Sequence, residues 1–525
     1  MRLNLLLLPI CCTLLFLSDL RAQIYQQWDY NFSGPESRSD NGQDIVIDNE
    51  NNVIAVGIED DADAFVGKWT NNGTLLWTAT HNGSANLTDA FYAVAIDDEN
   101  NIYAAGISHE ATSSWDIVTN KYNADGVLQW SKLKNGSSNI EENATDIAVD
   151  PFGNIYTAGY IDQIDEGQDY CVIKYDTDGN ELWMQTWGGP VGGSDVVYEM
   201  AIDFEGNVLL NGRMGSGGDS LDDFATIKYN PEGVLQWVKT YHQIYGETGF
   251  TIDVDGEGNV YAGGWAADGL SMGESLIIKY DPDGNTLWEQ RYHNGLGGVS
   301  EAWVLRTYGD VVYMAGASID WDLTGQDFMV LKYDADGNLL WDVAYDNGLN
   351  IADYLTSMTI DNAGNIVTSG LISDFTSGDI LTVKFNPDGE VLWAMTYNGE
   401  ANSYDEAWGV TTDNDGNVFV TGFDINESVY SDLVVIKYGE QQVENIQTQV
   451  NDLQLYPIPS SDVLFVDASI AFGDIVLMNT LGQIVLQQSI NYTSQGIDVS
   501  AIPAGSYIVK CISGEKTFVG KCVIK

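Results

Sequence analysis

Short stretches in which apolar and polar residues alternate, separated by turns rich in Gly, Asn and Asp, fill residues 23–440. The third repeating unit illustrates the pattern, and its four predicted strands are Asp146–Asp150, Ile155–Gly159, Tyr170–Tyr175 and Glu181–Thr186. Alternation among β-branched and aromatic residues is typical of short antiparallel strands. No stretch before residue 440 has helical periodicity of useful length. This region is therefore predicted to be all-β.

One motif, Lys-Tyr-Asp-x-Asp-Gly-x-Leu-Leu-Trp, returns about every 53 residues. Eight lysines open it: Lys68, Lys121, Lys174, Lys228, Lys279, Lys332, Lys384 and Lys437. Seven tryptophans close it: Trp77, Trp130, Trp183, Trp237, Trp288, Trp341 and Trp393. The last copy stops at Gly439, whereas Gln23–Gly34 reads like Trp393–Gly399, with Tyr30 in the place of Tyr397. Eight four-stranded units predict an eight-bladed β-propeller over residues 23–440, closed by the N-terminal strand.

The two ends of the chain differ from the repeats. Met1–Ala22 has an early basic residue, an apolar run and a short polar end, as a secretory signal peptide does. The apolar run is shorter than the ~20 residues that span a membrane, and we expect no transmembrane anchor in the mature chain. Residues 441–452 form a polar linker, and residues 453–525 contain further strands that indicate a small antiparallel β-sandwich.

The chain is strongly acidic, with 77 acidic and 21 basic residues and a net charge of −56. Such a surface repels nucleic acid and anionic lipid, so neither is an expected partner. Three cysteines follow the signal peptide: Cys171, Cys511 and Cys522. A hairpin turn at Gly514–Glu515 would place Tyr507 opposite Cys522 and keep the two C-terminal sulfurs apart, so three free thiols are expected.

Two series of acidic residues recur with the blades. One lies five residues before each repeated lysine, and the other opens the first strands and includes Asp40, Asp89, Asp195, Asp353 and Asp405. We expect these acids mainly to cap backbone N–H groups of the loops. The alternative is a ring of carboxylates that binds calcium or a cationic partner, for which these five are the candidate ligands. The repeated lysine is predicted to pair with an Asp of the first turn.

Function on a propeller is expected where the blades differ, in their loops. Three tryptophans outside the repeat fall in the variable loops between second and third strands: Trp115, Trp265 and Trp321. They are candidates for binding a sugar ring or a partner protein, and the alternative is that they pack against their own loops. Arg306 departs from the repeat on an innermost strand, where it would hold an anion or form an ion pair with a neighbouring blade.

Motifs of known catalytic mechanisms are not recognisable in the sequence. His81, His242 and His293 occupy related turns, and His109 stands alone in a loop. We therefore expect a non-enzymatic protein that binds a glycan or protein through its loop-rich face. A polysaccharide-active enzyme that uses loop carboxylates is the alternative.

The C-terminal region contains Tyr456-Pro457-x-Pro459, a turn that ends at Gly482, and Gly505-x-Tyr507. This combination resembles the type A sorting domain of the type IX secretion system of Bacteroidetes. The resemblance implies that the type IX machinery exports the chain from the periplasm, and that the mature protein is secreted or attached to the outer-membrane surface.

The repeats themselves are similar to bacterial β-propeller repeats of the SBBP type, which implies the fold but no activity. They are also similar to eight-bladed quinoprotein dehydrogenases, which place adjacent cysteines beside the cofactor. The mature chain has no adjacent cysteines, so no cofactor is expected, and a quinoprotein-like dehydrogenase ranks below the polysaccharide-active enzyme as an alternative. Calcium remains the alternative that the acidic series leaves open.

Overall fold

The structure is a computed structural model. It describes residues 24–36, 38–138, 140–164, 167–190, 192–215, 222–243, 246–267, 273–294, 299–320, 325–346, 352–373, 377–399, 401–426, 430–440, 454–467, 474–479, 484–489, 494–513 and 516–525. Over these residues every regular element is a strand, which confirms the all-β prediction, and no helix is present that could cross a membrane. The chain divides into two compact units, with the boundary between Glu440 and Gln441.

Four-stranded antiparallel sheets make up the first unit, and each contains consecutive strands except the last, which combines three consecutive strands with β1. The first sheet contains β2 (Asn41–Ile47), β3 (Val53–Glu59), β4 (Asp63–Trp69) and β5 (Leu75–His81), and the second contains β6 (Ala90–Ile96), β7 (Ile102–His109), β8 (Trp115–Tyr122) and β9 (Leu128–Lys134). The third contains β10 (Asn143–Val149), β11 (Ile155–Gln163), β12 (Gly167–Tyr175) and β13 (Glu181–Trp187), with β14 (Gly193–Ser194) paired to β12. The fourth contains β15 (Val196–Ile202), β16 (Val208–Gly215), β17 (Asp222–Tyr229) and β18 (Leu235–Tyr241). The four strands predicted for the third unit correspond to β10–β13.

The remaining sheets of this unit follow the same order. They contain β19 (Glu247–Val254), β20 (Val260–Ala266), β21 (Glu274–Tyr280) and β22 (Thr286–Tyr292); β23 (Ser300–Tyr308), β24 (Val311–Asp320), β25 (Gly325–Asp334) and β26 (Leu339–Tyr345); β27 (Ala352–Ile360), β28 (Ile366–Ser373), β29 (Gly378–Phe385) and β30 (Val391–Tyr397); and β31 (Glu406–Thr412), β32 (Val418–Ile425) and β33 (Ser431–Glu440) with β1 (Ile24–Phe32). One parallel pairing, Gln326 with Ala352, joins the sheets of β23–β26 and β27–β30.

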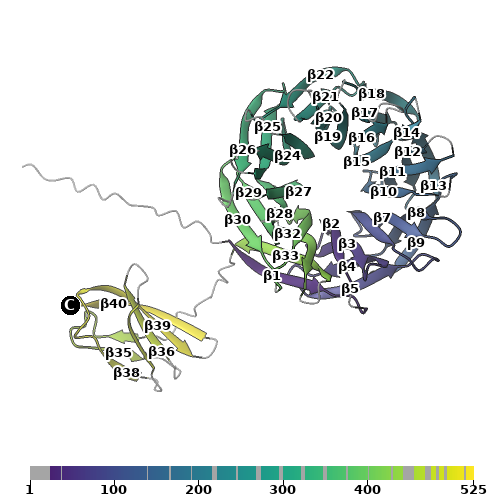
Figure 1. Cartoon of the computed structure of the whole chain (residues 1–525). Coiled ribbons are helices and arrows are strands. Elements are labelled where there is room, and N and C mark those ends of the chain that lie inside the picture. The colour runs from purple at the N-terminus through teal and green to yellow at the C-terminus, as the bar shows by residue number, and fades with distance from the viewer. Residues whose placement is uncertain are drawn as a thin grey trace, which may run out of the picture. The chain divides into compact units, whose positions relative to one another are not determined.

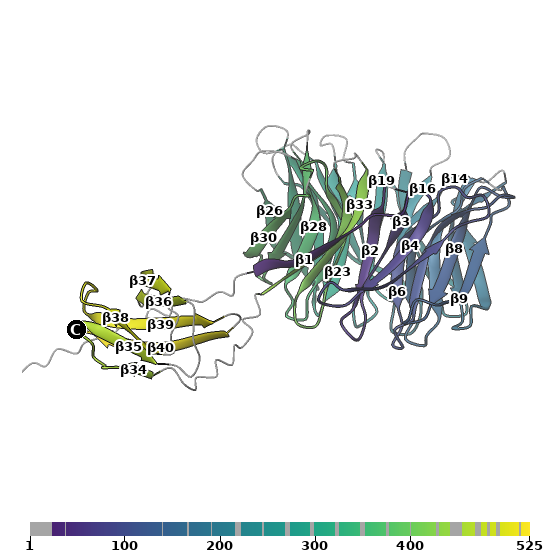
Figure 2. The same ribbon diagram turned by 90° about the horizontal axis from the view of Figure 1, so that it is seen from below.

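These sheets stand side by side around an axis, with the first strand of each innermost (Figure 1). The first strands β2, β6, β10, β15, β19, β23, β27 and β31 contact one another in that order, and β31 also contacts β2. Figure 2 shows the strands running between two opposite faces of this arrangement. One face carries the turns between first and second strands, and the other carries the longer loops.

The N-terminal strand pairs with the last repeat, as the sequence predicted. β1 lies antiparallel to β33, with Trp28 opposite Lys437 and Phe32 opposite Leu433. In the preceding repeat Trp393 lies opposite Lys384 and Tyr397 opposite Ile380. Because Leu433 and Ile380 each stand four residues before their lysine, Phe32 occupies the place of Tyr397. The prediction of Tyr30 for that place was therefore wrong by two residues.

Trp28 and six of the seven repeated tryptophans join their sheet to the next one. In each case the indole Nε1 donates to a carbonyl oxygen of the neighbouring third turn at 2.9–3.2 Å, and the lysine of the same repeat donates to the same carbonyl. The ring lies on a turn glycine; a Cβ at Gly233, whose φ is +78°, would come within 2.7 Å of Trp183. The tryptophans that make this lock are Trp28, Trp77, Trp130, Trp183, Trp237, Trp288 and Trp341. Trp28 supplies the lock between the last sheet and the first.

The predicted pairing of repeated lysines with first-turn acids is confirmed in five sheets. The ion pairs, with Nζ–Oδ2 distances of 2.8–3.7 Å, are Lys68–Asp48, Lys174–Asp150, Lys228–Asp203, Lys279–Asp255 and Lys384–Asp361. In the sheet of β23–β26 Tyr308 stands where the acid would be, and Lys332 is correspondingly more exposed. In these five sheets the lysine therefore pairs with an acid of the first turn of its own sheet and also donates a hydrogen bond to a turn of the neighbouring sheet.

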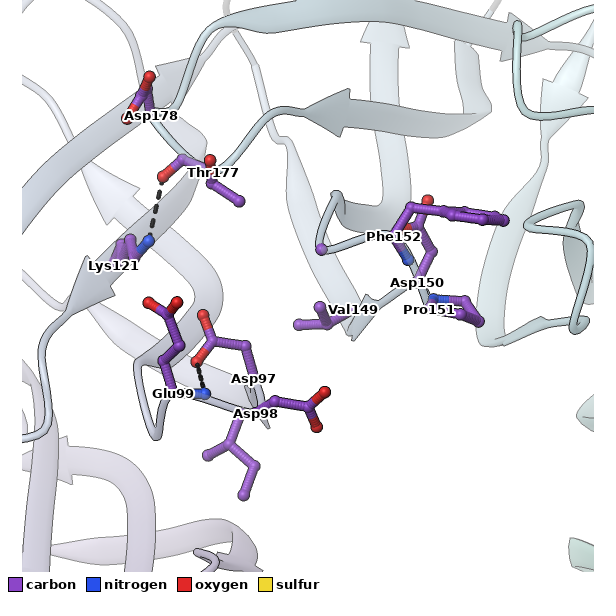
Figure 3. A pocket seen from close by; sticks show the side chains of 12 residues that line it. Asp97, Asp98, Glu99, Lys121, Val149, Asp150, Pro151, Phe152, Thr177 and Asp178 are labelled. Atoms are coloured by element: carbon purple, nitrogen blue, oxygen red, sulfur yellow. Dashed lines mark hydrogen bonds between the residues drawn. The ribbon is translucent and has the colours of Figure 1, made fainter.

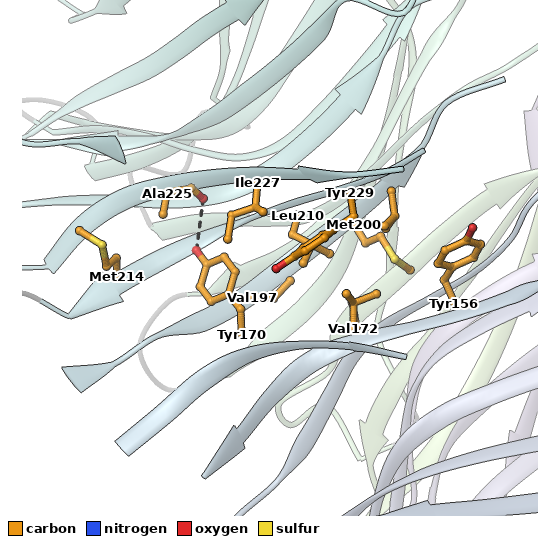
Figure 4. Close-up of a cluster of buried hydrophobic side chains, with 12 residues drawn as sticks. Tyr156, Tyr170, Val172, Val197, Met200, Leu210, Met214, Ala225, Ile227 and Tyr229 are labelled. Atoms are coloured by element: carbon orange, nitrogen blue, oxygen red, sulfur yellow. Dashed lines mark hydrogen bonds between the residues drawn. The ribbon is translucent and has the colours of Figure 1, made fainter. Parts of the chain in front are cut away.

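Apolar side chains fill the space between neighbouring sheets. The cluster of Figure 4 brings together Tyr156 and Tyr170 of one sheet with Leu210 and Ile227 of the next. Tyr170 Oη donates to the carbonyl oxygen of Ala225 at 3.2 Å, so its hydroxyl is satisfied within the core. Burial of this kind supplies most of the stability that a single blade lacks.

The second unit contains two small sheets. One contains β34 (Gln454–Tyr456), β35 (Val463–Asp467) and β38 (Ser494–Asp498), and the other contains β36 (Asp474–Asn479), β37 (Ile484–Ser489), β39 (Gly505–Ser513) and β40 (Lys516–Ile524). Side chains from both sheets share one buried core. The predicted register is confirmed, because Cys511 pairs with Phe518 and Tyr507 with Cys522. Cys171 and Cys522 are buried free thiols, as expected.

The sorting-motif residues of this unit lie at its edges and in its core. Tyr507 is buried and its hydroxyl donates to the carbonyl oxygen of Pro503 at 2.7 Å. Tyr456 stacks on Phe465 and remains 44% exposed. Gly482 lies outside the described residues. The motif therefore combines a core anchor with an exposed aromatic side chain.

Candidate functional site on the axial strands and loop face

Two of the three tryptophans proposed for ligand binding, Trp115 and Trp265, lie on strands rather than in loops. Trp115 is the first residue of β8 and pairs with His109, and Trp265 lies in β20 between Thr248 and Ser275. The prediction of loop positions was wrong because strand pairing continues past the polar turn residues. Both tryptophans are half-buried, and their indole N–H groups are buried without a hydrogen-bond acceptor. Trp321 lies outside the described residues.

The acidic residues that open the first strands bond to backbone amides. Asp40 Oδ2 accepts from the N–H of Gly34 at 2.8 Å, and its Oδ1 accepts from Asp60 at 2.7 Å. Asp89, Asp195 and Asp405 repeat this arrangement. These four and Asp353 are almost completely buried. These contacts favour the capping role that the sequence predicted over calcium ligation.

The first strands carry a set of aromatic residues that the sequence analysis missed. Each first strand has a β-bulge three residues after its opening position, and five of the eight bulge residues are aromatic: Tyr92, Tyr198, Phe250, Trp303 and Trp408. We call these five residues the axial aromatics. Trp408 is 43% exposed and Tyr198 is 37% exposed, and Tyr198 contacts Phe250 with ring centroids 5.5 Å apart. They lie toward the loop face, because the first strands begin there.

A charged network lies on the first strands, in the residues that follow the bulges. The carboxylates accept hydrogen bonds from the next first strand: Asp44 from Val94 N (2.9 Å), Asp146 from Met200 N (2.8 Å), Glu199 from Ile252 N (2.8 Å) and Asp253 from Thr307 N (2.7 Å). Arg306 Nη1 lies 2.8 Å from Glu199 Oε1, two sheets away. The contacts of Arg306 thus favour an ion pair over anion binding, although its partner lies two sheets away and not in the neighbouring blade that was predicted.

Burial shifts the protonation of this network. Burial, and then the charge of Glu199, raises the pKa of Asp146 to about 8, and burial raises the pKa of Asp44 to about 6. The nearby charges of Glu199 and Asp253 raise the pKa of Arg306 against the effect of burial. The network therefore holds a fixed positive charge and at least one carboxyl that is protonated at neutral pH.

We expect the stability of the first unit to fall as the pH rises toward 8. A carboxyl whose pKa is higher in the folded state binds its proton more tightly there, so its contribution is complete below the unfolded pKa of 3.8 and is lost by about pH 8. Asp146→Asn should make the slope of unfolding free energy against pH shallower by about 1.4 kcal/mol per pH unit between pH 5 and 7. Urea denaturation at several pH values measures this slope. Asp98→Asn, on an exposed turn, is the control and should leave it unchanged, and an unchanged slope in Asp146→Asn would refute the assignment.

A depression of about 700 Å³ lies on the opposite face, between the first turns of the second and third sheets. Acidic residues line it around Lys121, whose Nζ donates to the carbonyl oxygen of Thr177 at 3.1 Å (Figure 3). Asp97 Oδ1 accepts from the N–H of Glu99 within its own turn at 3.0 Å. This face is thus largely occupied by the repeated turns and by contacts between sheets.

Comparison with protein families gave three matches. Residues 454–525 match the secretion system C-terminal sorting domain, and residues 129–163 match the bacterial β-propeller repeat. Both confirm the resemblances seen in the sequence. A third family, described as outer membrane protein assembly factor BamB, matches residues 168–478. The sorting domain implies that the chain interacts with the type IX secretion machinery, and the protein is secreted or located on the cell surface.

Several solved structures are similar to this chain in backbone arrangement. PorZ of Porphyromonas gingivalis, a surface component of the type IX secretion system, has 10% identity and a TM-score of 0.32, covering 92% of this chain and 81% of its own. Sqt1 of Chaetomium thermophilum has 11% identity and a TM-score of 0.49, covering 79% and 99%. The β-propeller domain of the trilobed protease of Pyrococcus furiosus has 9% identity and a TM-score of 0.41, covering 68% and 96%. No curated protein matches the chain in sequence.

Proposed function

This chain belongs to the family described as outer membrane protein assembly factor BamB, and we propose that it is a secreted or surface-attached propeller that binds a glycan or protein through its loop-rich face. We propose a signal peptide at residues 1–22, an eight-bladed propeller at 23–440 closed by β1, a linker at 441–452 and the sorting domain at 453–525. The contact between β31 and β2 and the lock at Trp28 support eight blades.

The axial aromatics are the observation that carries the binding proposal. Rings that are partly exposed offer flat apolar surfaces on which sugar rings or partner side chains pack, and three of the axial aromatics, Tyr198, Phe250 and Trp303, lie on the neighbouring strands β15, β19 and β23. Glu199, Asp253 and Arg306 follow on these three strands and offer hydrogen-bond partners for hydroxyl groups. The opposite face offers less variation, because the repeated lysines, tryptophans and turn acids occupy it. Trp115 and Trp265 remain further candidates, and so does Trp321, which lies outside the described residues.

A glycan array probed with the full-length protein, with and without calcium, tests this proposal. We expect binding that Tyr198→Ala/Trp408→Ala weakens at least about tenfold, since losing a stacked ring costs about 1.4 kcal/mol or more. A Trp115→Ala/Trp265→Ala variant tests whether these two tryptophans, rather than the axial aromatics, bind the glycan. Phe152→Ala is the matched control, because Phe152 is 68% exposed on the opposite face. Equal weakening by Phe152→Ala would contradict binding at the loop face, and a silent array would direct the search to a protein partner.

The polysaccharide-active enzyme is a second candidate, and Asp146 favours it. A carboxyl that is protonated at neutral pH and lies near the charge of Glu199 has the arrangement of a general acid beside a carboxylate. If this candidate is right, Asp146→Asn should bind the same glycan and lose turnover, as measured by release of reducing ends. Turnover that Asp146→Asn leaves unchanged would exclude this role for Asp146.

A further inference from the structure

Three side chains from two adjacent sheets converge on the loop face. None of the three is one of the axial aromatics. Asp223 lies at the start of β17, His242 directly follows β18, and Glu247 begins β19. One oxygen or nitrogen of each lies within 4.8 Å of the others, and His242 Nδ1 is 2.6 Å from Asp223 Oδ1. We call these three residues the Asp–His–Glu cluster.

Glu247 departs from the repeat in a way that frees one carboxylate oxygen. Its Oε2 caps the N–H of Gln243 at 2.9 Å, as the equivalent Asp residues cap their own turns. In those sheets the second oxygen accepts from the N–H twenty residues later, as Asp195 does from Gly215. Here that N–H belongs to Ala267 and donates to the carbonyl oxygen of Gly246 at 3.1 Å instead. Glu247 Oε1 is therefore buried without a hydrogen-bond partner, which is costly unless a ligand completes it.

The charge around the Asp–His–Glu cluster suits a cation. Arg291 approaches from β22, but its guanidinium is engaged by Glu274 Oε2 at 3.3 Å and by Tyr241 Oη at 2.7 Å. Asp223 and Glu247 bring two carboxylates, whereas a neutral imidazole adds no charge. The side chain of His242 is 62% exposed, so a cation can reach the cluster from solvent.

We propose that Asp223, His242 and Glu247 bind a divalent transition-metal ion, for which Zn²⁺ is the representative. An imidazole nitrogen with two carboxylate oxygens is a ligand set that Zn²⁺ accepts readily, whereas calcium prefers six or more oxygens. Ligand atoms at about 2.1 Å in tetrahedral geometry lie about 3.4 Å apart. Glu247 therefore needs to move closer, and His242 Nδ1 and Asp223 Oδ1, now 2.6 Å apart, need to separate by about 1 Å. The exposed side leaves a fourth position for water or for a group of a bound molecule. The ion would also join the sheets of β15–β18 and β19–β22.

Zinc binding to the full-length, untagged protein tests the proposal. After treatment with chelator and desalting, we expect titration calorimetry to detect one Zn²⁺ site that His242→Gln and Glu247→Gln each weaken at least about tenfold. His293→Gln is the matched control, because His293 follows β22 as His242 follows β18, while Ser300 stands in the place of Glu247. His293→Gln should bind Zn²⁺ as the wild type does.

Proton NMR of the imidazole groups provides a readout that does not depend on stoichiometry. The chain has four histidines, and one equivalent of Zn²⁺ should shift the resonance that disappears in His242→Gln. A Zn²⁺ affinity that is unchanged in both ligand variants would overturn the proposal. The same holds if His293→Gln loses affinity equally, or if excess calcium displaces Zn²⁺, because either result indicates general attraction by the acidic surface.

Discussion

Replacing Trp28 by alanine is expected to lower the free energy of unfolding of the first unit by about 3 kcal/mol. Trp28 is half-buried, contacts Phe419 and covers Gly73 of the first sheet. Its Nε1 donates to the carbonyl oxygen of Asn71 at 2.9 Å, which Lys437 also approaches. The variant therefore loses the contact that joins the two ends of the repeat array. Chemical denaturation measures the loss, and faster amide exchange in β1 and β33 should accompany it.

Two neighbouring substitutions separate closure from general disturbance of β1. Trp28→Phe keeps most of the ring but loses the N–H, so it should cost about 1 kcal/mol. Gln26→Ala, an exposed position on the same strand, should stay within about 0.5 kcal/mol of the wild type. If Trp28→Ala cost no more than Gln26→Ala, β1 would not be holding the last sheet to the first, and the proposal of closure would fail.

The repeat made the strands and locks predictable, because both depend on local patterns that recur. The alternation of apolar and polar residues, the turn glycines and the spacing between the repeated Lys and Trp each arise from contacts within a blade or with the next blade. The match of Tyr30 to Tyr397 was wrong because it was anchored on residue type rather than on pairing with the lysine strand. Pairing Trp28 with Lys437 fixes the register and brings Phe32 to that position.

The axial aromatics were not predicted because a β-bulge changes which face a residue occupies. Strict alternation assigns Tyr198 and Trp408 to faces that the bulge then reverses. Their signal is nonetheless present in the sequence, three residues after each opening position of the first strands. The Asp–His–Glu cluster was missed for a different reason. Asp223 and Glu247 belong to separate strands and His242 follows a third, so no short sequence motif joins them. Glu replaces the usual Asp at position 247, but it does so at position 142 as well.

Replacing Asp361 by asparagine is the second substitution with a large expected effect. Lys384 Nζ lies 2.8 Å from Asp361 Oδ2, and the two side chains are only 9% and 4% exposed. Although burial opposes the charged form, Lys384 and Asn365 together lower the pKa of Asp361. Asp361→Asn keeps the shape of the turn and leaves the lysine charge buried without its partner. We expect a loss of about 3–5 kcal/mol in the free energy of unfolding, measured by urea denaturation at pH 7.

The double variant Lys384→Met/Asp361→Asn distinguishes the free-energy cost of a buried, unpaired lysine charge from the net contribution of the ion pair to stability. It should lie within about 1 kcal/mol of the wild type, because replacing both members removes the uncompensated charge. Lys332, which has Tyr308 instead of an acid and is more exposed, shows how a blade is built without the pair. Asp336→Asn, on an exposed turn, is the control and should change stability by less than about 0.5 kcal/mol. A double variant as unstable as Asp361→Asn would mean that the turn, and not the charge, depends on Asp361.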